Sequence, residues 1–347
     1  MVKSGFASTD AQEAPAAVSS DDRLAELDLI STPIEDLKYE TYKIEDYGVG
    51  ELPSLAWGVY TPGTGGYEEE RLTNYSVNPE VNGGKYDLFL AALDPQNGQN
   101  MSKTVPTLTS FLAGGNFQGK GYTGAIATLG DMETKEVGAR FQETDRAKMF
   151  SNFFMADIAT MMVGVRMSLN NGRAVAVDQE CPRGMQCFMG GKTQCRSMTS
   201  LDNVEIKYPK FEGKPLFKVT LNDGFSDGAS SIKHLYITPL KLKQLNLFFG
   251  GQKIADLEMM KAVIAHIPES EIYGRKKTMP FCQELYEAMT NDDIDLVREA
   301  IEYIEAGPRL TIDVDCACGQ TSFPYQLPLF RNPRYFLYNS KKLGKEQ

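Results

Sequence analysis

Five of the six cysteines lie in two short segments more than a hundred residues apart, and this arrangement constrains the fold more than any other feature. The first segment, Cys181–Cys195, reads CPRGMQCFMGGKTQC and includes Cys187. The second, DCACG, contains Cys316 and Cys318. If thiols of both segments share one metal ion or one disulfide, the middle of the chain must fold against its end. A metal site, disulfides and buried thiols are the three interpretations to weigh.

A structural zinc site is placed ahead of the other two interpretations. Zinc takes four ligands in tetrahedral geometry, usually from two short loops. Each segment follows a predicted strand, and its glycines allow the backbone to turn around a sulfur-ligated ion. The first residues lack the apolar centre of a signal peptide, so a reducing compartment is expected, where spaced cysteines bind metal more often than they pair. The candidate ligands are Cys181, Cys187, Cys195, Cys316 and Cys318, and four of these five are expected to bind the ion.

The spacing of these cysteines keeps the disulfide interpretation open. A regular knuckle reads Cys-x-x-Cys-Gly, whereas the second segment has one residue fewer between its cysteines, and the first has five and seven intervening residues. A disulfide between Cys181 and Cys187, or between the two segments, is therefore the next interpretation. Cys282, inside a predicted helix, is expected to be a small core residue.

Composition argues against several classes of function. The net charge is −10, and the longest basic run is GRKK at 274–277, whereas nucleic-acid binding needs clustered Lys and Arg. No uncharged apolar stretch reaches the length of about 18 residues that a membrane span needs. The 347 residues, 42% of them hydrophobic, are enough for two or three cores of a soluble globular protein.

No motif nominates a catalytic centre. The segment GGNFQGKG at 114–121 resembles a phosphate-binding loop, but Gly121 stands where Ser or Thr must follow the lysine, so a flexible glycine loop is expected. His234 and His266 are the two histidines, and His266 is expected to pack on a helix at 255–267. Neither a Gly-x-Ser-x-Gly elbow nor a His-Glu-x-x-His motif is present. We expect no enzyme activity, although an enzyme whose polar site escapes motif reading remains a third hypothesis.

Periodicity predicts the principal elements. An amphipathic helix is expected from Glu143, with Thr144 as its N-cap, and further helices at 255–267, 280–290 and 291–308. Strands are expected at 38–44, where Tyr39, Tyr42 and Ile44 face a core, at 309–315, before Cys181, and within 203–221 around a Gly-Lys-Pro turn. Loops or hairpins are expected at 59–87. Trp57 is expected to be a packing residue.

These elements predict an α+β protein. Its N-terminal half is strand-rich with long loops, and its C-terminal half mixes helices and strands and closes with a small cysteine unit like a zinc ribbon. The predicted regions are a flexible tail at 1–26, a loop- and strand-rich region at 27–142, a helix with strands and the first cysteine segment at 143–230, and a largely helical region at 231–347 that ends in a strand and the CACG turn.

The second half of the chain resembles a known family. A helix containing an Arg (FFMADIATMMVGVRMSL), a turn, a strand entering a cysteine segment, a helical region and the closing AGPRLTIDVDCACGQTSFPYQLPLFRNPRYF follow one another in order. This order is similar to that of the baseplate hub assembly proteins of T-even-type contractile bacteriophages. The resemblance begins at Glu143 and leaves residues 1–142 unexplained.

The resemblance implies a non-enzymatic structural or assembly component of the tail baseplate, in its hub or inner part. It implies other tail proteins as partners within a symmetric hetero-oligomeric assembly, and a location in the virion, preceded by assembly in the host cytoplasm. No nucleic-acid or membrane partner is expected. The alternative is a zinc-ribbon protein with a nucleic-acid or transcription role, because Lys192, Arg196, Arg331 and Arg334 flank the two cysteine segments.

Overall fold

The chain folds as an α+β protein with several small sheets. The computed structural model describes residues 28–60, 71–82, 86, 104–117, 120–130, 132–133, 150–169, 172–180, 194–226, 231–247, 264–266, 286–316, 319 and 321–338. Among these residues no helix is long and apolar enough to cross a membrane. The α+β class expected from the sequence is confirmed.

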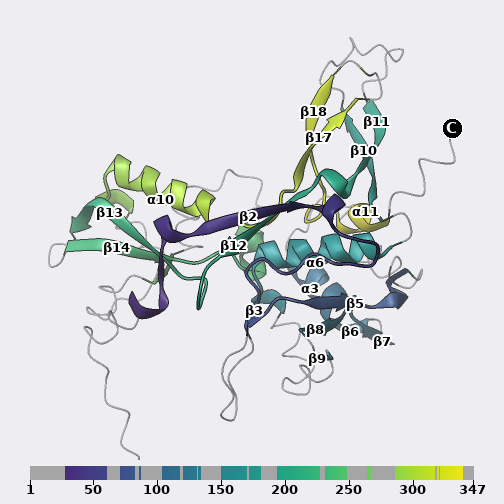
Figure 1. Cartoon of the computed structure of the whole chain (residues 1–347), viewed down its shortest axis with the longest axis horizontal. Coiled ribbons are helices and arrows are strands. Elements are labelled where there is room, and N and C mark those ends of the chain that lie inside the picture. Colours follow the sequence, from purple (N-terminus) through teal and green to yellow (C-terminus); the bar gives the residue numbers. More distant parts are fainter. Residues whose placement is uncertain are drawn as a thin grey trace, which may run out of the picture.

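The strands form seven small sheets in the described residues, with helices packed against them (Figure 1). The α-helices are α3 (Thr104–Ala113), α6 (Met155–Ser168), α10 (Asn291–Tyr303) and α11 (Pro333–Tyr338). The strands of the first half are β1 (Thr32–Pro33), β2 (Lys38–Lys43), β3 (Val59–Tyr60), β4 (Arg71–Leu72), β5 (Tyr75–Val77), β6 (Gly114–Phe117), β7 (Lys120–Thr123), β8 (Ile126–Leu129) and β9 (Met132–Glu133). Those of the second half are β10 (Ala174–Glu180), β11 (Gln194–Ser200), β12 (Glu205–Lys210), β13 (Phe217–Ser226), β14 (Ser231–Ile237), β15 (Ile264–His266), β16 (Gly307–Pro308), β17 (Thr311–Asp315) and β18 (Ser322–Gln326).

Helix α6 is the centre of the larger of two hydrophobic clusters (Figure 1). Every residue from Asp157 to Arg166 is buried, because α3, β5 and the C-terminal helix α11 contribute to the cluster around it. The helix begins at Met155, after Phe154, with no side-chain cap, and the predicted start at Glu143 and Thr144 lies outside the described residues. The expected helix is confirmed over Met155–Ser168, but its expected amphipathic character is wrong, since no face of its central turns reaches solvent.

The second hydrophobic cluster lies between α10 and the sheet of β13 and β14, on the left of Figure 1. Strands β13 and β14 are antiparallel, and α10 covers them with Ile294, Val297 and Ile301. Thr290 caps α10 by accepting the Asp293 N–H. The amphipathic helix predicted at 291–308 is confirmed, although it ends at Tyr303 and Gly307–Pro308 form a strand instead.

Two long strands connect these clusters. Strand β12 pairs with β2 on one side and with β16 on the other, and β2 runs across the molecule above α6 (Figure 1). The predicted strand at 38–44 is confirmed and delivers Ile44 into the larger cluster. Tyr42, however, is 44% exposed, because β2 is an edge strand whose outer face no other described element covers.

Two segments of the chain have a different secondary structure from the one expected. Residues 114–117 and 120–123 pair as the hairpin β6–β7 after helix α3, rather than forming a flexible loop. His266 lies in β15, which pairs with β14, so the expected helix is wrong at this position. Pairing with a neighbouring sheet overrides the local helical periodicity here. The remainder of the predicted helix at 255–267 lies outside the described residues.

Candidate functional site

The two cysteine segments connect the strands of two separate hairpins. Strands β10 and β11 are antiparallel partners from Ala174 with Ser200 to Glu180 with Gln194, and residues 181–193 join them. Strands β17 and β18 pair from Thr311 with Gln326 to Asp315 with Ser322. The strands expected before Cys181 and Cys316 are therefore confirmed.

Cys316 closes the second hairpin. Its N–H donates to the Thr321 carbonyl at 2.9 Å, and its own carbonyl accepts the Gly319 N–H at 2.8 Å. Gly319 has a φ of +67°, a left-handed conformation that a residue with a Cβ rarely adopts. The Cys316 side chain is buried at the edge of the larger cluster. The backbone thus turns tightly just beyond this thiol.

A common core holds the two hairpins together. Val175 and Val177 of the first hairpin belong to the same buried cluster as Ile312 and Val314 of the second. The second hairpin alternates exposed and buried residues along both strands, as expected for a ribbon with one covered face. In Figure 1 the two hairpins project together from one end of the molecule. The middle and the end of the chain therefore contribute to the same hydrophobic cluster through the hairpins that lead into the cysteine segments.

The buried guanidinium of Arg166, at the end of α6, holds the start of the first hairpin against the C-terminal helix α11. Its Nε donates to the Gly172 carbonyl at 2.8 Å, and its two terminal nitrogens donate to the carbonyls of Ala174 and Leu337. Burial lowers the pKa of Arg166 to about 10. One side chain therefore joins α6, the start of β10 and the C-terminal helix α11. An arginine in the last turn of a largely apolar helix is the sequence signal for this role.

The metal prediction rests largely on residues outside the described part of the chain. Cys181, Cys187 and Cys318 lie outside it, as does Cys282, and only the backbone of Cys195 is described, in β11. Cys316 is the one candidate ligand whose side chain is placed. Within the described residues no group of three or more His, Cys, Asp or Glu side chains could hold a metal ion.

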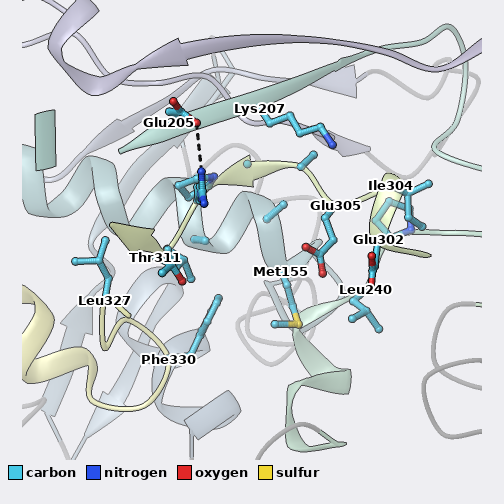
Figure 2. Close-up of a pocket in the computed structure, with 18 of the residues that line it drawn as sticks. Met155, Glu205, Lys207, Leu240, Glu302, Ile304, Glu305, Thr311, Leu327 and Phe330 are labelled. Carbon is cyan, nitrogen blue, oxygen red and sulfur yellow. Dashed lines mark ion pairs between the residues drawn. The ribbon is translucent and has the colours of Figure 1, made fainter. Parts of the chain in front are cut away.

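A cleft of 770 Å³ between the two hydrophobic clusters is a second candidate site, which sequence reasoning missed. Its walls come from β12, the C-terminal end of α10, the segment from Gly307 to Thr311, the start of α6 and the segment after β18. Figure 2 shows Leu327, Thr311 and Phe330 on one side of the cleft, and Ile304, Leu240, Glu302 and Glu305 on the other. The lining residues come from segments far apart in the sequence, so no local sequence motif marks the cleft.

The charged groups of the cleft are unevenly partnered. Glu205 and Arg309 form a loose ion pair at 3.9 Å. The Lys207 Nζ lies 3.7 Å from the centre of the Tyr39 ring and donates to the Tyr303 carbonyl at 3.4 Å. Burial lowers the pKa of Lys207. Burial and the neighbouring Glu302 raise the pKa of Glu305, against the opposing charge of Lys207.

Trp57 lies under the floor of the cleft and is the only tryptophan in the chain. It is fully buried, and its ring lies within 6.4 Å of the rings of Phe154, Phe211 and Phe217, centre to centre. The expectation that Trp57 is a packing residue is confirmed. Its backbone is held from two sides, since its N–H donates to Asp157 at 2.9 Å and its carbonyl accepts the Arg71 Nε–H at 2.8 Å.

Comparisons with protein-family models, with curated proteins and with solved structures find no match to this chain.

Proposed function

We propose that this chain is a non-enzymatic structural or assembly component of a contractile phage tail baseplate, in its hub or inner part. In this proposal a zinc ion bound by four of the five candidate cysteines joins the ends of the two hairpins. The observation that carries the metal is that each cysteine segment begins at the end of a hairpin, and that both hairpins contribute buried side chains to one hydrophobic cluster. The phage role comes from the resemblance of the second half of the chain.

The zinc in this proposal has an architectural role. Four thiolates leave zinc no open position for water, so such a site does not activate a substrate. Binding joins two segments separated by more than a hundred residues, and the metal-binding free energy then adds to the stability of the fold. The tight turn after Cys316, with left-handed Gly319, supports a knuckle-like end to the second hairpin.

The metal is tested by elemental analysis of the purified chain and of the double variant Cys316→Ser/Cys318→Ser. About one zinc per chain is expected for the parent, in line with one four-thiolate site, and none for the double variant. Cys282→Ser, outside the candidate set, is the matched control and keeps its zinc. Because Cys316 is buried, serine there destabilises the fold even without a metal, so bound zinc, rather than melting temperature, is the deciding measurement. A metal-free parent chain contradicts the zinc proposal.

The assembly role is tested by co-expression with the proteins encoded beside this chain. Co-elution with tail proteins on size-exclusion chromatography is expected, with the complex present in purified tails by mass spectrometry. Neighbouring genes that encode no tail proteins, together with salt-sensitive retention of RNA or DNA, favour the alternative zinc-ribbon role in nucleic-acid handling or transcription.

A further inference from the structure

The cleft between the two clusters has the size and the lining of a binding site for a peptide segment. Its 770 Å³ fall within the range of about 300–1,000 Å³ that is typical of ligand pockets. Apolar side chains line most of it: Met155, Ala159, Leu240, Ile304, Leu327 and Phe330. Met155 and Phe330 are only partly buried, so a large apolar side chain placed between them removes further apolar surface from water.

Two glutamates at one end of the cleft define the charge of the occupant. Glu302 and Glu305 both line the cleft beside Ile304, and in the described part of the chain neither forms an ion pair. Lys207, the cation that favours the ionised form of Glu305, lies against the Tyr39 and Tyr303 rings. The raised pKa of Glu305 reflects the same situation, because burial and Glu302 outweigh Lys207. A cation from a partner stabilises both carboxylates.

We propose that the cleft binds an extended segment of another protein that inserts a large apolar side chain between Met155 and Phe330 and places a Lys or Arg against Glu302 and Glu305. The identification of that protein as a neighbouring tail component rests on the proposed function. Apolar anchors next to a charged contact are typical of the few residues that dominate protein–protein affinity.

The proposal is tested with synthetic peptides and the fluorescence of Trp57. Since Trp57 is the only tryptophan and lies under the cleft floor, its emission reports occupancy. The probes are acetyl-Gly-Lys-Leu-Phe-Lys-Gly-amide and the same peptide with Glu in place of Lys, both titrated into the full chain. The basic peptide is expected to produce a saturable change, at an affinity at least about ten-fold above that of the acidic peptide.

Matched variants separate the contribution of charge to peptide affinity from the contribution of apolar contact. The double variant Glu302→Gln/Glu305→Gln is expected to weaken the basic peptide about ten-fold, whereas Glu299→Gln, on the exposed surface of the same helix and outside the cleft, leaves its affinity unchanged. Ala306→Phe fills the cleft without altering its charge and is expected to abolish binding, with circular dichroism as the check of folding. Equal affinity for the acidic and basic peptides, no saturable change, or an unaltered affinity in the double variant overturns the proposal.

The peptide assay is independent of the tail assignment. Charge-dependent binding in the cleft, combined with failure to associate with tail proteins, retains the peptide site and rejects the phage role. Association with tail proteins that the double variant Glu302→Gln/Glu305→Gln leaves intact retains the phage role and rejects the cleft as its docking site.

Discussion

The helices α6 and α10 show how differently two helices in one chain can use a buried aspartate. Asp157 of α6 and Asp293 of α10 are both 0% exposed. Both Asp293 oxygens accept backbone hydrogen bonds, from the Asn222 N–H at 2.7 Å and the Gly224 N–H at 2.9 Å. The Asp157 Oδ1 accepts the Trp57 N–H, but its Oδ2 has no hydrogen-bond partner among the described residues. The two carboxylates are therefore equally buried but differ in how many of their oxygens accept a hydrogen bond.

The surroundings explain the difference between them. Both aspartates lie in the first turn of their helix, where the dipole favours a negative charge, but Asp293 also holds the irregular part of β13 between Thr220 and Phe225. Asp157 faces the segment 56–58 from a helix that is covered on every side. Burial raises the pKa of Asp157 to about 7, although the backbone amides of that segment and Arg71 favour the ionised form. A satisfied carboxylate anchors a strand, while an incompletely satisfied one makes stability depend on pH.

The largest effect is expected from Asp293→Ala. The change leaves the N–H groups of Asn222 and Gly224 buried without acceptors, at a cost of about 3 kcal/mol in the free energy of unfolding. Urea denaturation measures this loss. Asp292→Ala, at the exposed neighbouring position, is the control and costs about 0.5 kcal/mol through the helix dipole alone. Equal losses for the two variants contradict the anchoring role of Asp293.

Asp157→Asn is expected to change the pH dependence of stability. Because the pKa of Asp157 is raised in the folded state, to about 7 from an ordinary value of 3.8, the folded chain binds more protons than the unfolded chain between these values. The wild-type chain therefore loses stability relative to the variant as the pH rises from about 4 to about 7. Urea denaturation of both chains across this range measures the difference. A constant difference shows that Asp157 does not titrate in this way.

The smallest of the three effects is expected from Gly164→Ala in α6. Alanine favours a helix interior over glycine by about 1 kcal/mol, but a Cβ at this position meets the Tyr75 hydroxyl oxygen at 2.1 Å. That hydroxyl donates to the Thr160 carbonyl at 3.0 Å in a buried site, so the ring cannot move freely. A net loss of about 1 kcal/mol is expected, measured as a lower melting temperature. Glu299→Ala, on the exposed face of α10, is the control and leaves the temperature unchanged or slightly higher.

Sequence patterns correctly predicted those helices and strands that have one buried face and one exposed face. The residue spacing in 291–303 predicts a helix with one apolar and one polar face, and α10 has one covered and one exposed face. The alternation in TIDVD places Ile312 and Val314 on the buried face of β17. The hairpin ends at which the two cysteine segments begin follow from the same kind of reasoning. The cysteine ligand set itself stays a prediction.

Other features could not be predicted from the sequence, because they depend on contacts between distant segments. The apolar spacing in 150–162 predicts a covered face, yet it cannot show that β16, β5 and α11 pack around α6 and bury its central turns. The strand at Ile264–His266 forms because β14 offers a free edge, which local periodicity does not record. The cleft is assembled from separate segments, so its apolar floor and its acidic end are never adjacent as one motif.

The sequence by itself determined the α+β fold class, the strands that lead into the cysteine segments and the capped helix α10. Each of these follows from patterns that extend over a few neighbouring residues. Only the tertiary structure decided that Arg166 joins three segments, that Asp157 and Asp293 differ in their hydrogen bonds, and that Glu302 and Glu305 lie at an apolar cleft. The physical reason is that burial and hydrogen-bond satisfaction depend on what the rest of the chain places around a residue.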